Sequence, residues 1–582
     1  MLVYGDHSER CDPRQRLGEL NHALTSVGGM GVGVRRHSSL VAILVEAGRL
    51  VQGVADSAFA VDGTDRLGSA DGLSRSLLRL ASAVCRSWDS NFAEIGELSP
   101  LAPGGPLPDE VVLKVPEGFA FYALYPEAYI EAARRLKLAA PVRVIGIRSI
   151  GTALAAIVAA ALKAPPPVTV RPFGDPSART IAIAPELERE LLEGDAHYVI
   201  VDEGPGRSGS SFGCVADWLT SRGVPVHRIA FLPGHAGPPG PDSSEAHRRI
   251  WSRVQREPAD FGDRWFGLIE SWSASLVGPL DGTPQDISGG RWRRLRYANE
   301  DQWPAAIPAW ERRKFLVRAG GGQWLVRFAG LGEVGEAKLR VAHALYSEGL
   351  VPEPLGFVHG FLIERWLEDA RPVRRDAKLV AEIGRYIGTR ARMLPAHSES
   401  GASVGELLTM CRRNVSLALG PAADRQLDPF ERQTDRLQSR ILRVRTDNRM
   451  APHEWLRTRN GALLKADALD HHQGHDLVGC QDVAWDIAGA ISEFGLDDAA
   501  SAALIGATEE ALRGEIDREL LRFYQIAYAT FRLGQSTIGV ELTGNEPNEA
   551  RRLSHLRDRH AAEVRLLLEG VRTTDRHQSL VG

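Results

Sequence analysis

The chain has 582 residues, of which 43% are hydrophobic and 25% are charged, and its formal net charge is −4. This composition is typical of a soluble globular protein, and the length predicts two to four domains. The near-neutral charge argues against nucleic-acid or membrane partners, and five widely spaced cysteines argue against a structural zinc site or a disulfide framework. No signal pattern opens the chain and no apolar run reaches membrane-spanning length, so we expect a cytoplasmic protein. The sequence leaves the oligomeric state open.

The first part of the chain predicts an irregular extension followed by mixed elements. Residues 1–38 show no clear periodic pattern and are expected to be irregular. Alternating apolar residues over 40–56 predict a β-hairpin. Helical periodicity predicts helices over 72–88 and 126–136, and a short apolar run predicts a strand over 111–115.

A tight turn follows the next predicted strand. The segment Arg143-Val-Ile-Gly-Ile-Arg-Ser-Ile-Gly-Thr152 is an apolar strand and then a polar turn, and an alanine-rich helix is expected over 153–163. A helix of this composition is equally well explained as a buried packing helix. The turn offers an anion positive charge, hydroxyl groups and close backbone approach, from Arg148, Ser149, Thr152, Gly146 and Gly151.

The most informative segment is His197-Tyr-Val-Ile-Val-Asp-Glu-Gly-Pro-Gly-Arg-Ser-Gly-Ser-Ser211, an apolar strand that ends in two carboxylates and a Gly/Ser-rich turn. Asp202 and Glu203 are suited to accept hydrogen bonds from neighbouring sugar hydroxyls. The turn, with the positive end of a helix expected from about Phe212, is suited to surround a phosphate. Its candidate phosphate-binding residues are Gly206, Arg207, Ser208, Gly209, Ser210 and Ser211. A ribose 5-phosphate satisfies both halves of this pattern.

This segment resembles the phosphoribosyl pyrophosphate (PRPP)-binding signature of type I phosphoribosyltransferases. Its turn is about one residue longer than usual, and the family's acidic residue is absent from it. The resemblance implies a parallel-sheet α/β domain over residues 39–236, with Asp202 and Glu203 as catalytic residues. It implies that the turn at 148–152 holds the pyrophosphate with Mg²⁺, and that a loop with Arg171 and Arg179 closes over PRPP. The acceptor would be a small nitrogenous, nucleobase-like molecule.

A second pattern begins after a connecting region predicted over 237–290. Two apolar strands around Gly320-Gly-Gly322 predict a hairpin, followed by a helix over 333–348 and a strand over 360–366. This succession resembles the N-terminal lobe of aminoglycoside phosphotransferase-like and choline-kinase-like proteins. The resemblance implies a two-lobed, kinase-like α+β domain over residues 291–575 that uses ATP and Mg²⁺.

The same resemblance implies specific site residues. Arg327 would hold nucleotide phosphates and pair with Glu336, although a surface ion pair explains these two residues equally well. Asp467 would orient an acceptor hydroxyl, and Asp482, with Asp476 as a rival, would bind Mg²⁺. The family's asparagine falls on a histidine here, and the run of histidines at 471–475 is an alternative metal site. Helices over 509–531 and 549–569 are expected to form the C-terminal lobe.

Three functions follow from these patterns. The prediction we favour from sequence is PRPP-dependent phosphoribosyl transfer to a nitrogenous acceptor, with the kinase-like domain acting on the same or a linked metabolite. The second is an ATP-dependent small-molecule phosphotransferase whose N-terminal domain senses a ribose phosphate. The third is a non-enzymatic PRPP-binding regulator.

Overall fold

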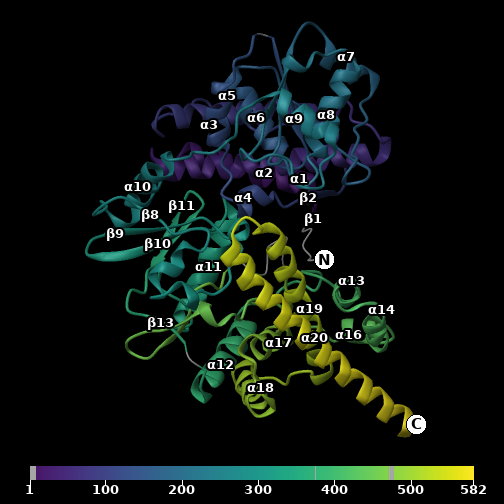
Figure 1. Ribbon diagram of the computed structural model, residues 1–582. Coiled ribbons are helices and arrows are strands. Elements are labelled where there is room, and N and C mark those ends of the chain that lie inside the picture. Colours follow the sequence, from purple (N-terminus) through teal and green to yellow (C-terminus); the bar gives the residue numbers. More distant parts are fainter. Residues whose placement is uncertain (1–7, 140, 374, 470, 472–477, 582) are drawn as a thin grey trace.

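The structure is a computed structural model that describes residues 8–139, 141–373, 375–469, 471 and 478–581 (Figure 1). The strands of the N-terminal half are β1 (Ser8–Cys11), β2 (Val111–Lys114), β3 (Val142–Ile147), β4 (Val168–Val170), β5 (His197–Val201), β6 (Ile229–Leu232) and β7 (Gln255–Arg256). Its helices are α1 (Pro13–Gly28), α2 (Val34–Asp62), α3 (Ser69–Asp89), α4 (Glu117–Phe121), α5 (Pro126–Arg135), α6 (Gly151–Leu162), α7 (Pro185–Leu192), α8 (Ser210–Ser221), α9 (Glu245–Arg253) and α10 (Arg264–Val277).

The predicted parallel sheet is confirmed, with strand order β4-β3-β5-β6-β7. Successive residues of a strand face opposite sides of the sheet, which explains why its strands are continuously apolar. In β5, Val199 and Val201 belong to the core beneath α2, α3, α5 and α6. Tyr198 and Ile200 belong to a second core with α8 and α9 on the other face.

The predicted hairpin over 40–56 is wrong, because these residues lie inside the long helix α2. The helix is buried almost all round, since α1, α3, α6 and β2 pack on it, so its apolar residues follow no single stripe. Gly48 lies at the crossing with α6, where a Cβ atom would come within 2.6 Å of the Ala153 Cβ. Length and apolar composition alone would let α2 cross a membrane, but two thirds of its most apolar stretch is buried inside this fold.

The predicted irregular extension over 1–38 is also wrong for its described part, which contains β1 and α1. Asp12 caps α1 by accepting a hydrogen bond from the Arg14 N–H at 2.7 Å, and Pro13 occupies the first helical position. This Asp-Pro pair is a helix-start signal in the sequence. Residues 237–290 contain the last parallel strand, β7, and an edge strand of the next sheet, β8 (Gln285–Asp286).

The second half contains an antiparallel sheet and a helical region. The strands are β8 (Gln285–Asp286), β9 (Lys314–Ala319), β10 (Gly322–Phe328), β11 (Pro354–Val358), β12 (Phe361–Arg365), β13 (Arg371–Pro372), β14 (Arg443–Val444), β15 (Trp455–Arg457), β16 (Leu463–Lys465) and β17 (Gln481–Asp482). The helices are α11 (Glu333–Ser347), α12 (Ala377–Met393), α13 (Val404–Leu419), α14 (Pro421–Asp424), α15 (Asp428–Glu431), α16 (Thr434–Gln438), α17 (Val483–Phe494), α18 (Asp498–Leu512), α19 (Arg518–Leu542) and α20 (Pro547–Val581).

The predicted hairpin of β9 and β10 is confirmed, and the sheet order is β11-β12-β10-β9-β8. Gly320 and Gly321 make its turn with φ of +58° and +72°, which is the left-handed region that such a turn requires. The predicted helix over 509–531 is interrupted, because α18 ends before Arg513, which has a φ of +60°, and α19 begins after the Asp517 cap. The predicted helix over 549–569 lies within α20.

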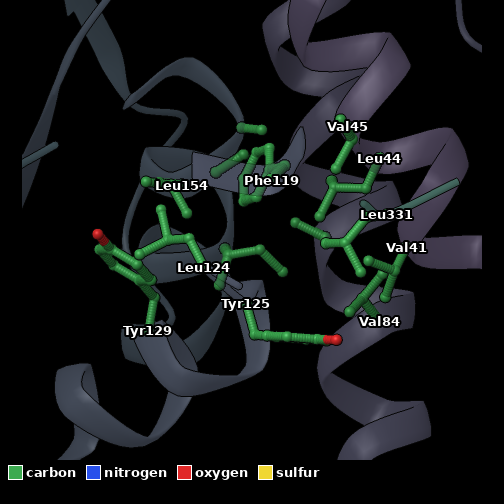
Figure 2. Close-up of a cluster of buried hydrophobic side chains, with 14 of the residues drawn as sticks. Val41, Leu44, Val45, Val84, Phe119, Leu124, Tyr125, Tyr129, Leu154 and Leu331 are labelled. Atoms are coloured by element: carbon green, nitrogen blue, oxygen red, sulfur yellow. The ribbon is translucent and has the colours of Figure 1, made fainter. Parts of the chain in front are cut away.

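The two halves share one hydrophobic core. Leu331, which follows β10, packs among Val41 of α2, Phe119 of α4 and Tyr125 beside α5 (Figure 2). The backbone N–H of Leu331 donates to the Phe119 carbonyl at 2.9 Å. The antiparallel sheet is therefore packed directly on the N-terminal half, while the C-terminal helices form a separate core.

Candidate functional site

A pocket of about 140 Å³ lies between the antiparallel sheet and the segment 449–471. Strands β9 and β10 supply Lys314, Leu325 and Arg327, and the opposite wall supplies Glu454 and Asp467. Further lining residues are Ile287, Trp292, Arg296, Trp310, Glu311, Arg312, Trp366, Arg449, His453, Leu456, Ala466 and His471. The pocket thus combines aromatic and aliphatic walls with a concentration of charged groups, as ligand pockets do.

Arg327 is the basic residue at the centre of this pocket. Its side chain is 5% exposed, and its guanidinium lies 2.9 Å from the Asp467 carboxylate and 3.5 Å from that of Glu364. Burial alone would raise the pKa of Asp467, but His471, Lys314 and Arg327 outweigh it and hold this pKa well below its usual value. Asp467 is therefore ionised at neutral pH and faces the pocket.

Behind the pocket lies a buried charge cluster centred on Lys465. The Lys465 ammonium is fully buried and lies 2.6 Å from the Glu454 carboxylate and 3.3 Å from that of Asp447. It also donates to the Asp467 carbonyl at 2.5 Å. Burial would raise the pKa of Asp447, yet Lys465, His471 and Arg390 outweigh it and lower that pKa.

The structure places some of the predicted site residues of this half in the pocket and others outside it. Asp467 lies in the pocket, so its position agrees with a functional role, while its assignment as the group that orients an acceptor stays a prediction. Glu336 is exposed on α11, and the carboxylate partners that the structure gives Arg327 are Asp467 and Glu364. The predicted Arg327–Glu336 pair is therefore replaced. Asp476 lies outside the described residues.

Asp482 is not placed as a metal ligand in the pocket. It is the N-cap of α17, where its carboxylate accepts from the backbone N–H of Ala484 at 2.9 Å and of Leu442 at 3.0 Å. The capping role satisfies both oxygens of a side chain that is 7% exposed. The sequence analysis missed Asp447, Glu454 and Lys465, and the polar triplet Thr446-Asp-Asn448 after Ile441-Leu-Arg-Val-Arg445 was the available signal.

The predicted phosphate turn of the N-terminal half lines a second pocket, of about 450 Å³. Asp202, Arg179 and residues 204–211 surround it at the N-terminus of α8. The Arg179 guanidinium donates to the Ser211 hydroxyl at 2.8 Å. The Ser208 and Ser210 hydroxyls are both directed to the Pro176 carbonyl, at 2.8 and 2.7 Å.

The two adjacent carboxylates have different surroundings. Asp202 lines this pocket, whereas Glu203 accepts from the backbone N–H of Gly118 in α4 at 3.2 Å. Burial raises the pKa of Asp202 to about 7. Burial, with the neighbouring charges of Glu117 and Asp202, raises the pKa of Glu203 to about 8. Both groups exchange protons near neutral pH, which is a property of many functional carboxylates.

The structure places Arg148 against protein carboxylates, where the sequence predicted a contact with pyrophosphate. Its guanidinium is 5% exposed and is held by Asp65 and, at 2.9 Å, by Asp56, both supplied by α2 and the loop after it. The same Asp56 holds Arg171, so this arginine does not cover the pocket either. Because residues 40–56 were predicted to form a hairpin, the Asp56 carboxylate of α2 was not expected at this edge of the sheet.

The rest of the 148–152 turn packs against protein. Thr152 is 1% exposed, and the Ser149 carbonyl accepts the Thr152 N–H at 3.1 Å. A Cβ atom at Gly151 would lie 2.7 Å from the Val201 carbonyl oxygen. The glycine thus allows close contact with the neighbouring strand, where the sequence suggested contact with a ligand.

No family model and no curated protein matches the chain. Among solved structures, the choline kinase LicA from Streptococcus pneumoniae is similar at 16% identity and a TM-score of 0.30, over 43% of this chain and 89% of that one. The spectinomycin phosphotransferase APH(9)-Ia, in complex with ADP and spectinomycin, is similar at 11% identity and 0.32, over 54% and 98%. A macrolide 2'-phosphotransferase type I is similar at 15% and 0.31, over 50% and 96%. At these TM-scores the similarity alone establishes neither fold nor activity.

Proposed function

We propose that the pocket between the antiparallel sheet and residues 449–471 binds ATP, and that the chain transfers a phosphoryl group from it to a small molecule. The observation that carries this proposal is the Arg327–Asp467 pair at 2.9 Å, in which a buried cation and an ionised carboxylate face one pocket. Triphosphate oxygens would replace Asp467 as the partner of Arg327, and a divalent cation would replace Arg327 as the partner of Asp467. Phosphoryl transfer depends mainly on such positioning and charge stabilisation.

The lining residues divide into groups that suit the parts of a nucleotide. Leu325, Leu456 and the ring of Trp366 offer apolar surface to a base. Lys314 and Arg327 offer positive charge to phosphates. Arginine at this position binds phosphate by two parallel N–H donors, so its replacement by lysine is not conservative.

The donor set also fits Mg²⁺. The carboxylate of Asp467 lines the pocket, and carboxylate oxygens are the hard donors that this ion prefers. When bound, Mg²⁺ would neutralise charge on the phosphates. Asp447 is fully buried against Lys465 and the Tyr386 hydroxyl, so we assign it a positioning role behind the pocket.

Calorimetry on the full chain with ATP and Mg²⁺ tests the proposal. We expect saturable binding that Asp467→Asn and Arg327→Ala each weaken by about 10- to 100-fold, because a charged hydrogen bond contributes roughly 1.5–3 kcal/mol. Glu336→Gln is the matched control, since Glu336 is exposed on the same lobe and should leave binding unchanged. Absence of ATP binding in the folded protein would refute the proposal.

Transfer itself is measured separately. The protein is incubated with ATP, Mg²⁺ and a pooled metabolite extract, and new phosphorylated species are sought by mass spectrometry. Products that form with the normal protein and vanish with Asp467→Asn support a phosphotransferase. ATP binding without any product would leave the pocket as a nucleotide-sensing site and would contradict the catalytic part of the proposal.

We infer a second function for the N-terminal pocket, namely binding of a ribose phosphate such as PRPP. What supports it is the joint position of Asp202, Arg179 and the turn 204–211 at the start of α8. Titration with PRPP and Mg²⁺ should give binding that Arg179→Ala reduces, while Arg222→Ala, at the far end of α8, should not. Release of pyrophosphate with an offered nucleobase would indicate transfer, and binding without release would indicate a sensor.

A further inference from the structure

Two histidines and a glutamate from distant parts of the chain meet inside the shared core. His37 lies on α2, Glu127 on α5, and His359 in the turn between β11 and β12. One oxygen of Glu127 is 2.7 Å from His37 Nε2 and 3.0 Å from His359 Nε2. All three side chains are fully buried.

The surroundings fix the orientation of both imidazoles. His37 Nδ1 is 2.9 Å from the Ser87 hydroxyl of α3. The backbone carbonyl of His359 accepts from the Tyr125 hydroxyl at 2.7 Å, and the ring of Trp272 meets the His359 imidazole edge-on at 4.6 Å. A hydrogen bond from the second imidazole nitrogen to a polar group is the usual support of a metal-binding histidine.

The cluster leaves buried polar atoms without partners. Among the described residues, Glu127 Oε2 and His359 Nδ1 have no hydrogen-bond partner, and the 3.0 Å contact of His359 Nε2 with Glu127 lacks hydrogen-bond geometry. Among the ion pairs of the described residues, those of Glu127 involve only His37 and His359, with no lysine or arginine. A buried carboxylate and buried imidazoles in this state are costly unless a further group satisfies them.

We propose that His37, Glu127 and His359 bind one Zn²⁺ ion. The three ligand atoms lie within 4.8 Å of one another. Two imidazoles and a carboxylate are ligands of tetrahedral zinc, with bonds of about 2.0–2.2 Å. The nitrogen-to-oxygen distances need to open by only a few tenths of an ångström, to about 3.3 Å, for an ion to sit between them. Glu127 Oε2 or one water completes the coordination.

The ion would have a structural role. The ligands join α2 and α5 of the N-terminal half to a turn of the antiparallel sheet, at a place closed to solvent. Zinc bound there stabilises the packing of the two halves, because its binding energy is available only when all three elements are assembled. The cysteine pattern argued against zinc, but this site uses no cysteine, and its ligands are too far apart in sequence to form a motif.

A second buried group, Asp447, Glu454 and His471, is the natural competitor for a metal. The Lys465 ammonium already lies between its carboxylates, 2.6 Å from Glu454 and 3.3 Å from Asp447. An ammonium at this position repels a cation. We therefore assign zinc to the histidine pair of the shared core alone.

Metal analysis of the full chain, without a histidine tag, tests the proposal. The protein is produced with added zinc, desalted and measured by inductively coupled plasma mass spectrometry. We expect about one zinc per chain. Glu127→Gln and His359→Asn should each lose it, whereas His471→Gln and His560→Gln should keep it. His560 is a matched control, because it is a fully buried histidine beside a glutamate on α20.

Cobalt substitution keeps the test valid if the core variants fail to fold. Co²⁺ in the normal chain should give the intense visible bands of a tetrahedral site with nitrogen and oxygen ligands, and Zn²⁺ should displace it. A folded protein that is produced with added zinc and contains no bound metal after desalting would overturn the proposal. So would zinc that is lost in His471→Gln but kept in Glu127→Gln.

Discussion

Replacement of Lys465 by methionine should strongly destabilise the C-terminal half. The ammonium is fully buried and contacts the carboxylates of Glu454 and Asp447 at 2.6 and 3.3 Å. Methionine fills a similar volume but leaves these two carboxylates without their cation. Breaking a buried ion pair from one side costs about 3–5 kcal/mol. At roughly 2–4 °C per kcal/mol for a unit of about 200 residues, the melting temperature should fall by about 6–20 °C.

Differential scanning calorimetry near pH 7 measures this shift, and Lys378→Met is the control. Lys378 is 70% exposed and lies 3.9 Å from Glu382, so its loss should change stability by less than about 0.5 kcal/mol. Adding Glu454→Gln to the Lys465 variant removes one uncompensated charge and should recover part of the loss. A double variant no more stable than the single one, or a single shift as small as the control, would refute the electrostatic reasoning.

The pH dependence of the same variant follows from the pKa of Asp447. This pKa is held below its ordinary value in the folded protein, so the stabilisation it brings is present above about pH 4 and is lost as the pH falls. The variant lacks the contribution of Lys465 to that stabilisation. The difference in melting temperature between the two proteins should therefore be largest near neutral pH and become smaller toward acid.

Three further predictions concern other buried groups. Burial raises the pKa of Cys85 and Cys411 to about 12, so iodoacetamide near pH 8 should leave both unlabelled until the protein is unfolded, as mass spectrometry would report. Burial raises the pKa values of Asp202 and Glu203 to about 7 and about 8 in the folded state. The folded state therefore binds more protons than the unfolded state between about pH 4 and pH 8, and it loses stability as the pH rises across this window. The double variant Asp202→Asn, Glu203→Gln should hence exceed the normal protein in melting temperature by more at pH 8 than at pH 5, as differential scanning calorimetry would measure. Arg148→Met should cost about 3–5 kcal/mol in urea unfolding, because it removes the cation paired with the buried Asp65, while Asp56 keeps Arg171.

Short, strongly patterned elements could be predicted from the sequence. The parallel strands β3, β5 and β6 appear as apolar runs before polar turns, and the β9–β10 hairpin carries its glycine turn in the sequence. The helix α2 could not be recognised in the same way. Its residues over 40–56 are apolar on several faces because four elements pack on it, and a helix buried all round has no stripe to distinguish it from a hairpin.

The site residues show the same difference between local features and features that depend on long-range packing. A turn such as 204–211 is a local feature, so the sequence indicated it and the structure lines a pocket with it. The partners of a charged side chain depend on long-range packing, and they were not predictable. Arg148 meets an aspartate that lies 92 residues away, and Arg327 meets one 140 residues away. For this reason Arg148 was assigned to a ligand, and Arg327 was paired with Glu336.

One short helix connects the two candidate pockets. In α4, the Gly118 N–H donates to Glu203, next to the Asp202 that lines the N-terminal pocket. At the other end of α4, the Phe121 carbonyl accepts from Arg312, which lines the nucleotide pocket. Between them, the Phe119 carbonyl accepts the backbone N–H of Leu331, which follows β10. The segment 237–290 also packs in this core, through Phe261, Trp265 and Trp272. Dividing the chain there would therefore expose surfaces that are buried in one core.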